Sequence, residues 1–172
     1  MKSIAVMDER FLPQVVSLAN QVHGENYLDL AKLAELHLQG IKHNINASYV
    51  ALIDKQVVGY RLSFAAGQWP LDEWCSVPLW PVPPPQMAYF KSVAVAPELQ
   101  GQGLGTQLLQ ASIGSLQQQG ATAGLAHIWQ QSPGNAAQRY FSKAGASLLK
   151  VHADRWLHLS KTAGYLCPIC GN

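Results

Sequence analysis

The stretch Ser92-Val93-Ala94-Val95-Ala96-Pro97-Glu98-Leu99-Gln100-Gly101-Gln102-Gly103-Leu104-Gly105-Thr106 decides the fold of this chain. Its first residues alternate with valine and predict a strand, and its glycine-rich second half leads into a predicted helix. Because glycine has no Cβ, main-chain N–H groups at Gly101, Gly103 and Gly105 can approach a ligand closely. The free N–H groups and the dipole at the start of the helix favour an anion. The stretch therefore predicts a strand, a phosphate-binding loop and a helix.

Two common nucleotide-binding motifs do not match this loop. A P-loop requires Gly-Lys-Ser/Thr after its glycines, whereas Gly103 is followed by Leu104-Gly105-Thr106. A dinucleotide-binding fold carries an acidic residue about 20 residues after its glycines, and that region reads Thr122-Ala123-Gly124-Leu125-Ala126 here. Both interpretations therefore fail.

A third pattern fits. The segment Gln100-Gly101-Gln102-Gly103-Leu104-Gly105 matches Q/R-x-x-G-x-G/A, and Val93-Ala94-Val95-Ala96-Pro97-Glu98 resembles the strand and Pro-Glu turn that precede this loop in the GNAT acetyltransferase superfamily. The resemblance covers residues 87–149 and extends more loosely to the N-terminal half. It implies an α/β fold with a GNAT-like mixed central β-sheet flanked by helices on both faces. It also implies an enzyme, an N-acetyltransferase that moves the acetyl group of acetyl-CoA to a primary amine of a small molecule or peptide.

The same resemblance assigns the coenzyme site. Main-chain N–H groups of the loop would hold the pyrophosphate of acetyl-CoA, and the strand would pair its main chain with the pantetheine amides. The residues expected to bind acetyl-CoA are Val93, Val95, Gln100, Gly101, Gln102, Gly103, Leu104, Gly105, Thr106 and Asn135. A main-chain N–H of the strand would also polarise the thioester carbonyl, as tetrahedral intermediates require.

The catalytic residues are less clearly marked. In the superfamily the general acid is commonly the tyrosine of a Tyr-x-Lys-x-Gly segment, and this register holds Phe141-Ser142-Lys143-Ala144-Gly145. Tyr140 lies one residue earlier, about 100° around the helix, and is the candidate acid if the helix is rotated or shifted; a half-buried aromatic is the alternative. Asn135 is also displaced by one, with Gly134 at the matching place. His127 is the candidate base because its ordinary pKa suits proton transfer near neutrality, although a histidine on an otherwise apolar strand is more often a hydrogen-bonded core residue.

Composition and apolar spacing predict a single enzyme-sized domain. A chain of 172 residues buries roughly 70% of its unfolded surface, and 48% hydrophobic residues exclude a disordered chain. A net charge of +2 without a basic block, no membrane-length apolar run and no signal-like start predict a cytoplasmic protein without nucleic-acid or membrane partners. The predicted helices span 11–22, 28–38, 104–119 and 135–144, and the predicted strands span 48–53, 57–64, 125–129, 148–151 and 155–159.

Two further segments stand out within the expected division into a catalytic domain (1–160) and a tail (161–172). Residues 67–87 are rich in proline and tryptophan, and we expect them to form an irregular loop. In one interpretation Trp69, Trp74 and Trp80 line an acceptor pocket, where Asp72 and Glu73 attract a cationic amine. In the other, the tryptophans only fasten the loop to the rest of the domain.

The tail contains Cys167-Pro168-Ile169-Cys170-Gly171, which resembles one knuckle of a zinc ribbon or rubredoxin. Structural zinc takes four ligands, so Cys75 with His152 or His158, or the same knuckle in a homodimer, would complete the site. A redox dithiol and an unliganded tail are the alternatives. Two other functions remain open: a catalytically degenerate coenzyme A-binding sensor and a zinc-knuckle interaction protein.

Overall fold

The computed structural model describes residues 1–130, 132–153 and 155. At its centre is a five-stranded sheet with the order β1-β4-β5-β6-β7. The strands are β1 (Lys2–Val6), β4 (Tyr49–Ile53), β5 (Gln56–Phe64), β6 (Met87–Val95) and β7 (Ala123–Leu125). The first four are antiparallel to their neighbours, whereas β6 and β7 run parallel. The sheet is therefore mixed, as the sequence predicts.

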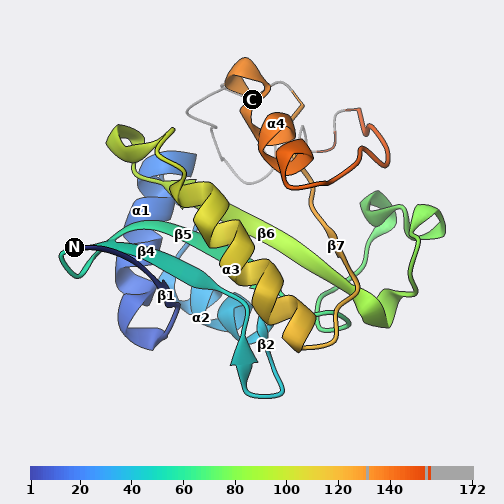
Figure 1. The fold of residues 1–172 in the computed structure, drawn as a ribbon, viewed down its shortest axis with the longest axis horizontal. Coiled ribbons are helices and arrows are strands. Elements are labelled where there is room, and N and C mark those ends of the chain that lie inside the picture. The colour runs from blue at the N-terminus through green and yellow to red at the C-terminus, as the bar shows by residue number, and fades with distance from the viewer. Residues whose placement is uncertain (131, 154, 156–172) are drawn as a thin grey trace.

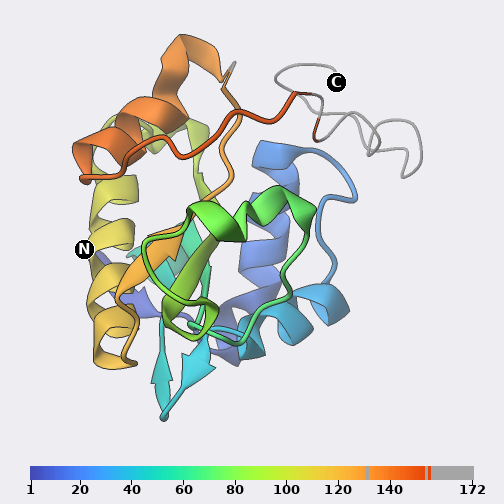
Figure 2. The same ribbon diagram turned by 90° about the vertical axis from the view of Figure 1, so that its right-hand side faces the viewer.

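Helices cover both faces of this sheet (Figures 1 and 2). On one face, α1 (Leu12–His23) and α2 (Leu30–Leu38) bury Val15, Leu18 and Leu33 together with side chains of β5. On the other face, α3 (Leu104–Gln118) buries Leu104 and Leu108 against β4. After β7 the chain forms α4 (Ala136–Lys143). The predicted α/β fold with helices on both faces is confirmed.

The close fit of α3 to the sheet depends on small residues. Ser112 of α3 donates a hydrogen bond of 2.7 Å to the carbonyl of Ala47, and its Oγ also lies 2.7 Å from the Oγ of Ser63. On the same face of β5, a Cβ at Gly59 would lie 3.4 Å from Leu108 and 3.3 Å from the Ala94 carbonyl. These contacts fix the first turn of α3 beside the end of β6.

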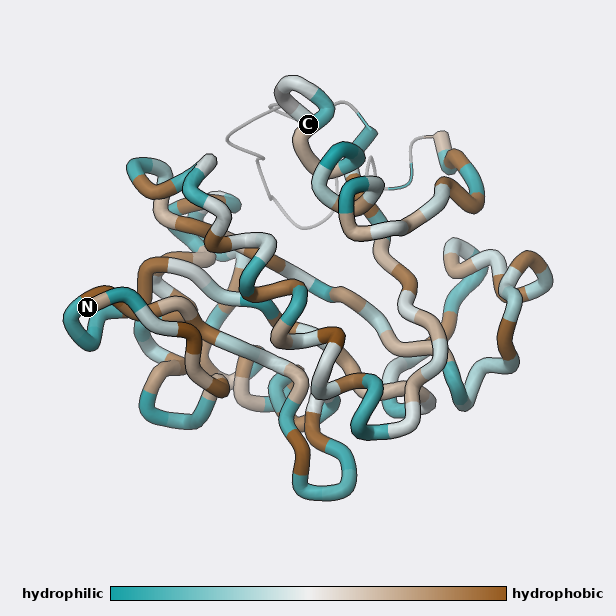
Figure 3. The backbone as a smooth tube through the Cα atoms, in the orientation of Figure 1, coloured by the Kyte–Doolittle hydropathy of each residue, from teal (hydrophilic) through white to brown (hydrophobic). Residues whose placement is uncertain are grey.

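Two hairpins have turns of the type that suits the twist of antiparallel strands. The β4–β5 turn places Asp54 and Lys55 at φ +48° and +70°, and the turn between β2 (Ile41–Lys42) and β3 (Ile45–Asn46) places His43 and Asn44 at φ +54° and +60°. Pairs of positive φ are typical of type I′ hairpins. The β4–β5 hairpin is predicted correctly, whereas β1 is not predicted and the two-residue strands of the β2–β3 hairpin are too short for the apolar pattern to reveal. Figure 3 shows the β2–β3 turn as a hydrophilic tip below the sheet.

Two of the predicted strands differ in the structure. The last described strand is Ala123–Leu125 rather than 125–129. Gly124, which resembles a turn residue, allows the ring of Phe90 to lie against β7, since a Cβ there would approach Phe90 Cε2 to 2.5 Å. Residues 148–151 form no strand, and Leu148 and Val151 are 65% and 53% exposed.

Other parts of the prediction fall partly or wholly on undescribed residues. Of the range 155–159 only Arg155 is described, and the tail 161–172 lies outside the described residues. Within the described part of the chain, no helix has the length and apolar character needed to cross a membrane.

Candidate functional site

The site is built where β6 and β7 separate. Their parallel pairing includes only Met87 with Ala123, Ala88 with Gly124 and Tyr89 with Leu125, while β6 continues to Val95. The second half of β6 therefore has an open edge inside the sheet, next to the start of α3 (Figure 1).

The main chain of Val93 and Val95 faces this open edge. Ala96 N–H donates to the Val58 carbonyl of β5 at 2.8 Å, and alternate residues of an antiparallel strand face opposite sides. Consistent with this orientation, the Val95 carbonyl accepts a hydrogen bond from Gln100 Nε2 at 3.1 Å. The Val93 carbonyl lies 3.2 Å from His23 Nε2, which carries the proton because a carbonyl only accepts. The main-chain groups of both valines therefore point away from β5, and their pairing with an extended ligand stays a prediction.

The glycine loop leads directly into α3. Gly101 and Gly103 have φ values of +77° and +80°, and a Cβ on either would meet no atom within 4 Å. Gly103 is the N-cap of α3 and no side chain caps the helix, so the N–H groups of the first turn are available to an anion. The observed geometry fits a pyrophosphate held by main-chain N–H groups.

The other residues predicted to bind the coenzyme lie in the loop, in the first turn of α3 and at the start of α4. Gln102 Oε1 accepts from Lys2 Nζ at 3.2 Å; Leu104 is buried in the core; and Thr106 lines a cavity of about 300 Å³ between α3 and α4. Asn135 is the N-cap of α4 at φ +52°, and its side chain makes no capping hydrogen bond.

Tyr140 points from α4 toward the coenzyme loop. Its hydroxyl donates to the Gly105 carbonyl at 2.7 Å and accepts from Arg61 Nη2 at 3.1 Å. Phe141, which occupies the family's tyrosine position, packs against Phe90 with ring centroids 6.0 Å apart. Burial raises the pKa of Tyr140, whereas the charge and hydrogen bond of Arg61 lower it. The structure thus brings the hydroxyl of Tyr140 to the first turn of α3, whereas Phe141, which has no hydroxyl, packs on Phe90.

His127 lies just beyond the end of β7 with both ring nitrogens hydrogen-bonded. Nε2 is 2.8 Å from the Trp74 carbonyl and therefore carries the proton, so Nδ1 accepts from the Tyr89 hydroxyl at 2.7 Å. Burial is the main cause that lowers the pKa of His127, and it raises the pKa of Tyr89 to about 12. In this arrangement neutral His127 joins β6, the 67–87 loop and the segment after β7.

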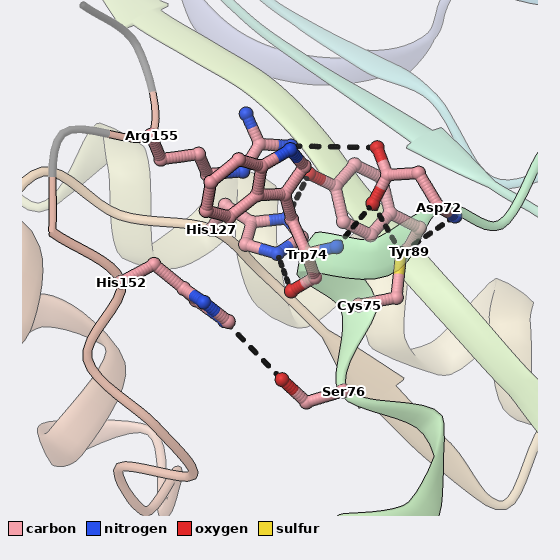
Figure 4. A network of polar contacts seen from close by, with 8 residues as sticks. All are labelled: Asp72, Trp74, Cys75, Ser76, Tyr89, His127, His152 and Arg155. Atoms are coloured by element: carbon pink, nitrogen blue, oxygen red, sulfur yellow. Dashed lines mark hydrogen bonds and ion pairs between the residues drawn. The ribbon is translucent and has the colours of Figure 1, made fainter.

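Figure 4 shows that the 67–87 loop and the C-terminal described segment meet around His127. Asp72 Oδ1 accepts from the main-chain N–H of Trp74 at 2.9 Å and from Cys75 Sγ at 3.3 Å. Arg155 lies over the Trp74 ring at 5.9 Å, with Nη2 3.8 Å from Asp72 Oδ2. His152 Nε2 lies 3.2 Å from Ser76 Oγ. Asp72 therefore stabilises the local turn by hydrogen bonds and also places its negative charge near Arg155.

The tryptophans of this loop are held by main-chain carbonyls. Trp69 Nε1 donates to the Met87 carbonyl at 2.8 Å, and Trp80 Nε1 donates to the Cys75 carbonyl at 2.7 Å. Trp69 also stacks on Tyr89 with ring centroids 4.7 Å apart. The Trp69 contacts fasten the loop to the part of β6 that pairs with β7, whereas the Trp80 bond joins two parts of the loop itself.

A cluster of hydroxyl groups on the α1 side of β6 is not predicted by the sequence analysis. Ser92 Oγ lies 2.7 Å from the Tyr60 hydroxyl and 3.1 Å from the Tyr27 hydroxyl, and His23 stacks near Tyr27 at 4.5 Å. Burial lowers the pKa of His23. The only local signal is the sequence His23-Gly24 at the end of a predicted helix, because the contact with Val93 joins residues 70 positions apart.

The described residues give no support to the predicted metal site. Among them, no group of three or more His, Cys, Asp or Glu side chains could hold a metal ion. Cys75 is buried against Asp72, and His152 contacts Ser76 instead. Cys167, Cys170 and His158 lie outside the described residues.

Comparisons with known proteins agree with this geometry. The structure is similar to that of AAC(6')-Iy in complex with the bisubstrate analogue CoA-S-monomethyl-acetylneamine, with a TM-score of 0.68, 18% identity and coverage of 88% of this chain and 95% of that one. It is also similar to Ard1 from Thermoplasma volcanium (TM-score 0.66, 16% identity, coverage 89% and 90%). The ribosomal-protein-S18-alanine N-acetyltransferase from Escherichia coli matches at a TM-score of 0.58, with 16% identity and coverage of 84% and 77%.

At these identities the structural matches show the fold alone. No curated protein sequence matches the chain. The model of the acetyltransferase (GNAT) family, however, matches residues 12–146, a range that includes α1, the whole open edge of β6, the glycine loop and α4. The chain therefore belongs to the GNAT acetyltransferase family.

Proposed function

We propose that this chain is an N-acetyltransferase that transfers the acetyl group of acetyl-CoA to a primary amine of a small molecule or peptide. The observation that carries the proposal is the uncapped start of α3, with Gly101 and Gly103 at positive φ, next to the open edge of β6. A ligand with an anionic group at the loop and an extended, amide-containing chain along the edge matches the pyrophosphate and the pantetheine arm of coenzyme A.

In this proposal the main chain does most of the coenzyme binding. N–H groups from Gly101 to Thr106 hold the pyrophosphate at the positive end of the helix dipole. The pantetheine amides pair with Val93 and Val95, replacing the contacts that His23 and Gln100 make with their carbonyls. An N–H of the same edge polarises the thioester carbonyl, which accumulates negative charge when the amine attacks.

Proton transfer falls to groups on the two sides of the edge. Tyr140, on the α3 side, protonates the departing thiolate as the general acid. On the other side, His127 is the candidate base, and its Nδ1 takes up a proton when the bond to the Tyr89 hydroxyl is exchanged for one to the acceptor. Water provides the alternative route for the proton that the ammonium loses.

The acceptor amine binds on the side formed by the 67–87 loop. Trp69 and Tyr89 supply a stacked aromatic surface there, and Asp72 supplies a carboxylate near Arg155. An aromatic surface beside a carboxylate suits a cationic amine. Several solved structures with this fold carry aminoglycoside acetyltransferase activity in their names, and one is named a ribosomal-protein-S18-alanine N-acetyltransferase, so aminoglycosides and peptides both belong in the assay panel.

Calorimetric titration with acetyl-CoA followed by a thiol-release assay against a panel of amines tests the proposal. Saturable binding with release on one amine supports an acetyltransferase and identifies its acceptor class. Binding without release on any amine supports the coenzyme A-binding sensor, which Phe141 at the family's tyrosine position also favours. Tyr140→Phe should lower kcat by about 10² or more while the Kd for acetyl-CoA stays close to that of the unchanged protein.

We also propose, from the sequence alone, that Cys167 and Cys170 of the 161–172 tail provide two ligands of a structural zinc ion. The proposal is independent of acetyl transfer, and no residue of the described site takes part in it. Its remaining ligands come from a second subunit or from the part of the chain after Asp154.

A further inference from the structure

Arg61 is the largest fully buried side chain of the described structure, at 1% exposure in the middle of β5. Within the described part of the chain, no carboxylate forms an ion pair with it, and its Nε has no hydrogen-bond partner. Burial of a guanidinium without a counter-charge is costly. We therefore expect this charge to make a contribution that offsets the cost of its burial.

The surroundings of Arg61 connect it to a single hydroxyl group. Its guanidinium lies 5.5 Å from the Phe90 ring, 5.6 Å from Tyr140 and 5.7 Å from Phe141. Among the described residues, its hydrogen bond runs from Nη2 to the Tyr140 hydroxyl at 3.1 Å, and that hydroxyl donates to the Gly105 carbonyl at 2.7 Å. The charge is thus linked through Tyr140 to the first turn of α3.

The ring of Tyr140 lies close to the main chain of Gly105. A Cβ at Gly105 would already touch the ring of Tyr140, 3.4 Å from Cε2. The ring therefore lies directly over the start of α3, where the uncapped N–H groups are found. The hydroxyl of Tyr140 is held between the buried cation and the proposed coenzyme loop.

Few other charges face Tyr140. Of the residues that share its cavity, α3 contributes Thr106, Leu109, Gln110 and Ile113, none of which ionises, and α4 contributes Lys143. Phe90 and Arg61 face it from the sheet. Arg61 is the charged group bonded to the hydroxyl, while Lys143 lines the cavity and makes no hydrogen bond with Tyr140 in the described structure.

We propose that Arg61 is a positioning residue for Tyr140: it holds the phenol against the coenzyme loop and stabilises the phenolate that remains after Tyr140 has protonated the coenzyme A thiolate. The inference rests on the proposed acetyl transfer and deepens it. It explains why a cation stays buried at this place with no ion pair to a carboxylate of the described residues.

The proton balance of this step is simple. When the tetrahedral intermediate collapses, the C–S bond breaks and the electron pair stays on sulfur. The O–H bond of Tyr140 then breaks and an S–H bond forms, which leaves a phenolate that keeps its hydrogen bond to Arg61 Nη2. The nitrogen of the product gives up its extra proton, which returns to the phenolate through water. A charge-assisted hydrogen bond to Arg61 favours the ionised phenol, and this opposes the effect of burial on the pKa of Tyr140.

The test compares Arg61→Gln, Arg61→Lys and Tyr140→Phe, with Lys143→Gln as the control that removes the other cation of the same cavity. The titration of Tyr140 is read from tyrosinate absorbance as the difference between each protein and the same protein carrying Tyr140→Phe. We expect Arg61→Gln to raise the pKa of Tyr140, Arg61→Lys to raise it less, and Lys143→Gln to change it little. With an accepted amine, Arg61→Gln should lower kcat at least about tenfold and leave the KM for acetyl-CoA nearly unchanged.

A merely structural role would give different results. If Arg61 acts through Tyr140, Arg61→Gln has no further effect on kcat once Tyr140→Phe is present. An equal loss in both backgrounds, or an unchanged Tyr140 titration in Arg61→Gln, would overturn the inference. Thermal unfolding shows whether Arg61→Gln folds. If it does not, Arg61→Lys, which keeps the charge, is compared with the unchanged protein in the same two assays. Lack of thiol release by the unchanged protein on every amine contradicts the proposed function, whereas release that is insensitive to Arg61 contradicts only this inference.

Discussion

Replacement of Gly103 by valine should separate coenzyme binding from folding. Gly103 has φ +80° and a Cβ there would meet no atom within 4 Å, so valine encounters no clash, only a left-handed backbone that it rarely adopts. Gly120, just beyond the other end of α3, offers a matched control: its φ is +96°, and a Cβ there also meets nothing within 4 Å. The two changes impose similar backbone strain at opposite ends of one helix.

The expected magnitudes differ for stability and for binding. Left-handed backbone costs an L-residue about 1–2 kcal/mol, and in a domain of this size each kcal/mol lowers the Tm by about 2–4 °C. Both variants should therefore unfold about 2–8 °C earlier. Relief of the strain at Gly103 would rotate the N–H groups of the loop. Loss of two hydrogen bonds to a charged group, at about 1.5–3 kcal/mol each, raises the Kd about 10²- to 10⁴-fold.

Thermal unfolding and calorimetric titration with acetyl-CoA, carried out well below both transitions, measure the two effects. We expect Gly120→Val to bind acetyl-CoA within about threefold of the unchanged protein and Gly103→Val to bind it far more weakly. Near-normal affinity in a folded Gly103→Val protein would refute the assignment of the pyrophosphate to this loop. Equal weakening in the two variants would show that strain in α3, rather than the loop, controls binding.

Three further predictions concern other parts of the molecule. Burial lowers the pKa of His23, His37 and His127 below 6.5, so the unfolded chain binds more protons than the folded one below that pH. The stability present above pH 6.5 is therefore lost as the pH falls further, by at most about 1.4 kcal/mol per histidine and pH unit. In His127→Gln the fall of Tm with pH should be shallower, and an unchanged slope would show that His127 does not titrate on unfolding. Trp69→Leu removes the bond to the Met87 carbonyl and the stack on Tyr89 and should cost about 2 kcal/mol of unfolding free energy; denaturant unfolding measures it, and a cost near zero would mean that Trp69 does not fasten the loop. Metal analysis of protein purified without chelator should find zinc that Cys167→Ser loses, and metal-free unchanged protein counts against the knuckle.

The sequence predicts the strand, the glycine loop and the following helix well because their signal is local. Glycines with positive φ, the preceding strand and the following helix are neighbours along the chain, so the pattern and the structure coincide at Val95, Gly101 and Gly103. The same holds for the β4–β5 hairpin, where two adjacent strands are joined by a two-residue turn.

Features that depend on distant contacts are not predicted in this way. Arg61 occupies a strand with an apolar pattern, and its hydrogen-bond partner Tyr140 lies 79 residues later in the chain. Gly124 resembles a turn residue until the ring of Phe90 is placed against it, which explains the displaced last strand. The choice between Tyr140 and its neighbour also depends on the rotation of α4, and the helix sequence alone leaves that rotation open.

Because β6 separates from β7, the second half of β6 has an edge that no strand of the described sheet pairs with. Unpaired strand edges invite other extended chains, and proteins commonly blunt them with side chains. Here His23 and Gln100 cover the carbonyls of Val93 and Val95, which hinders association with a second polypeptide but yields to a ligand that brings amide groups of its own. If acetyl-CoA fills that place, it acts as the missing strand. Heat resistance would then rise with coenzyme concentration, and the fold would be complete only in the presence of its substrate.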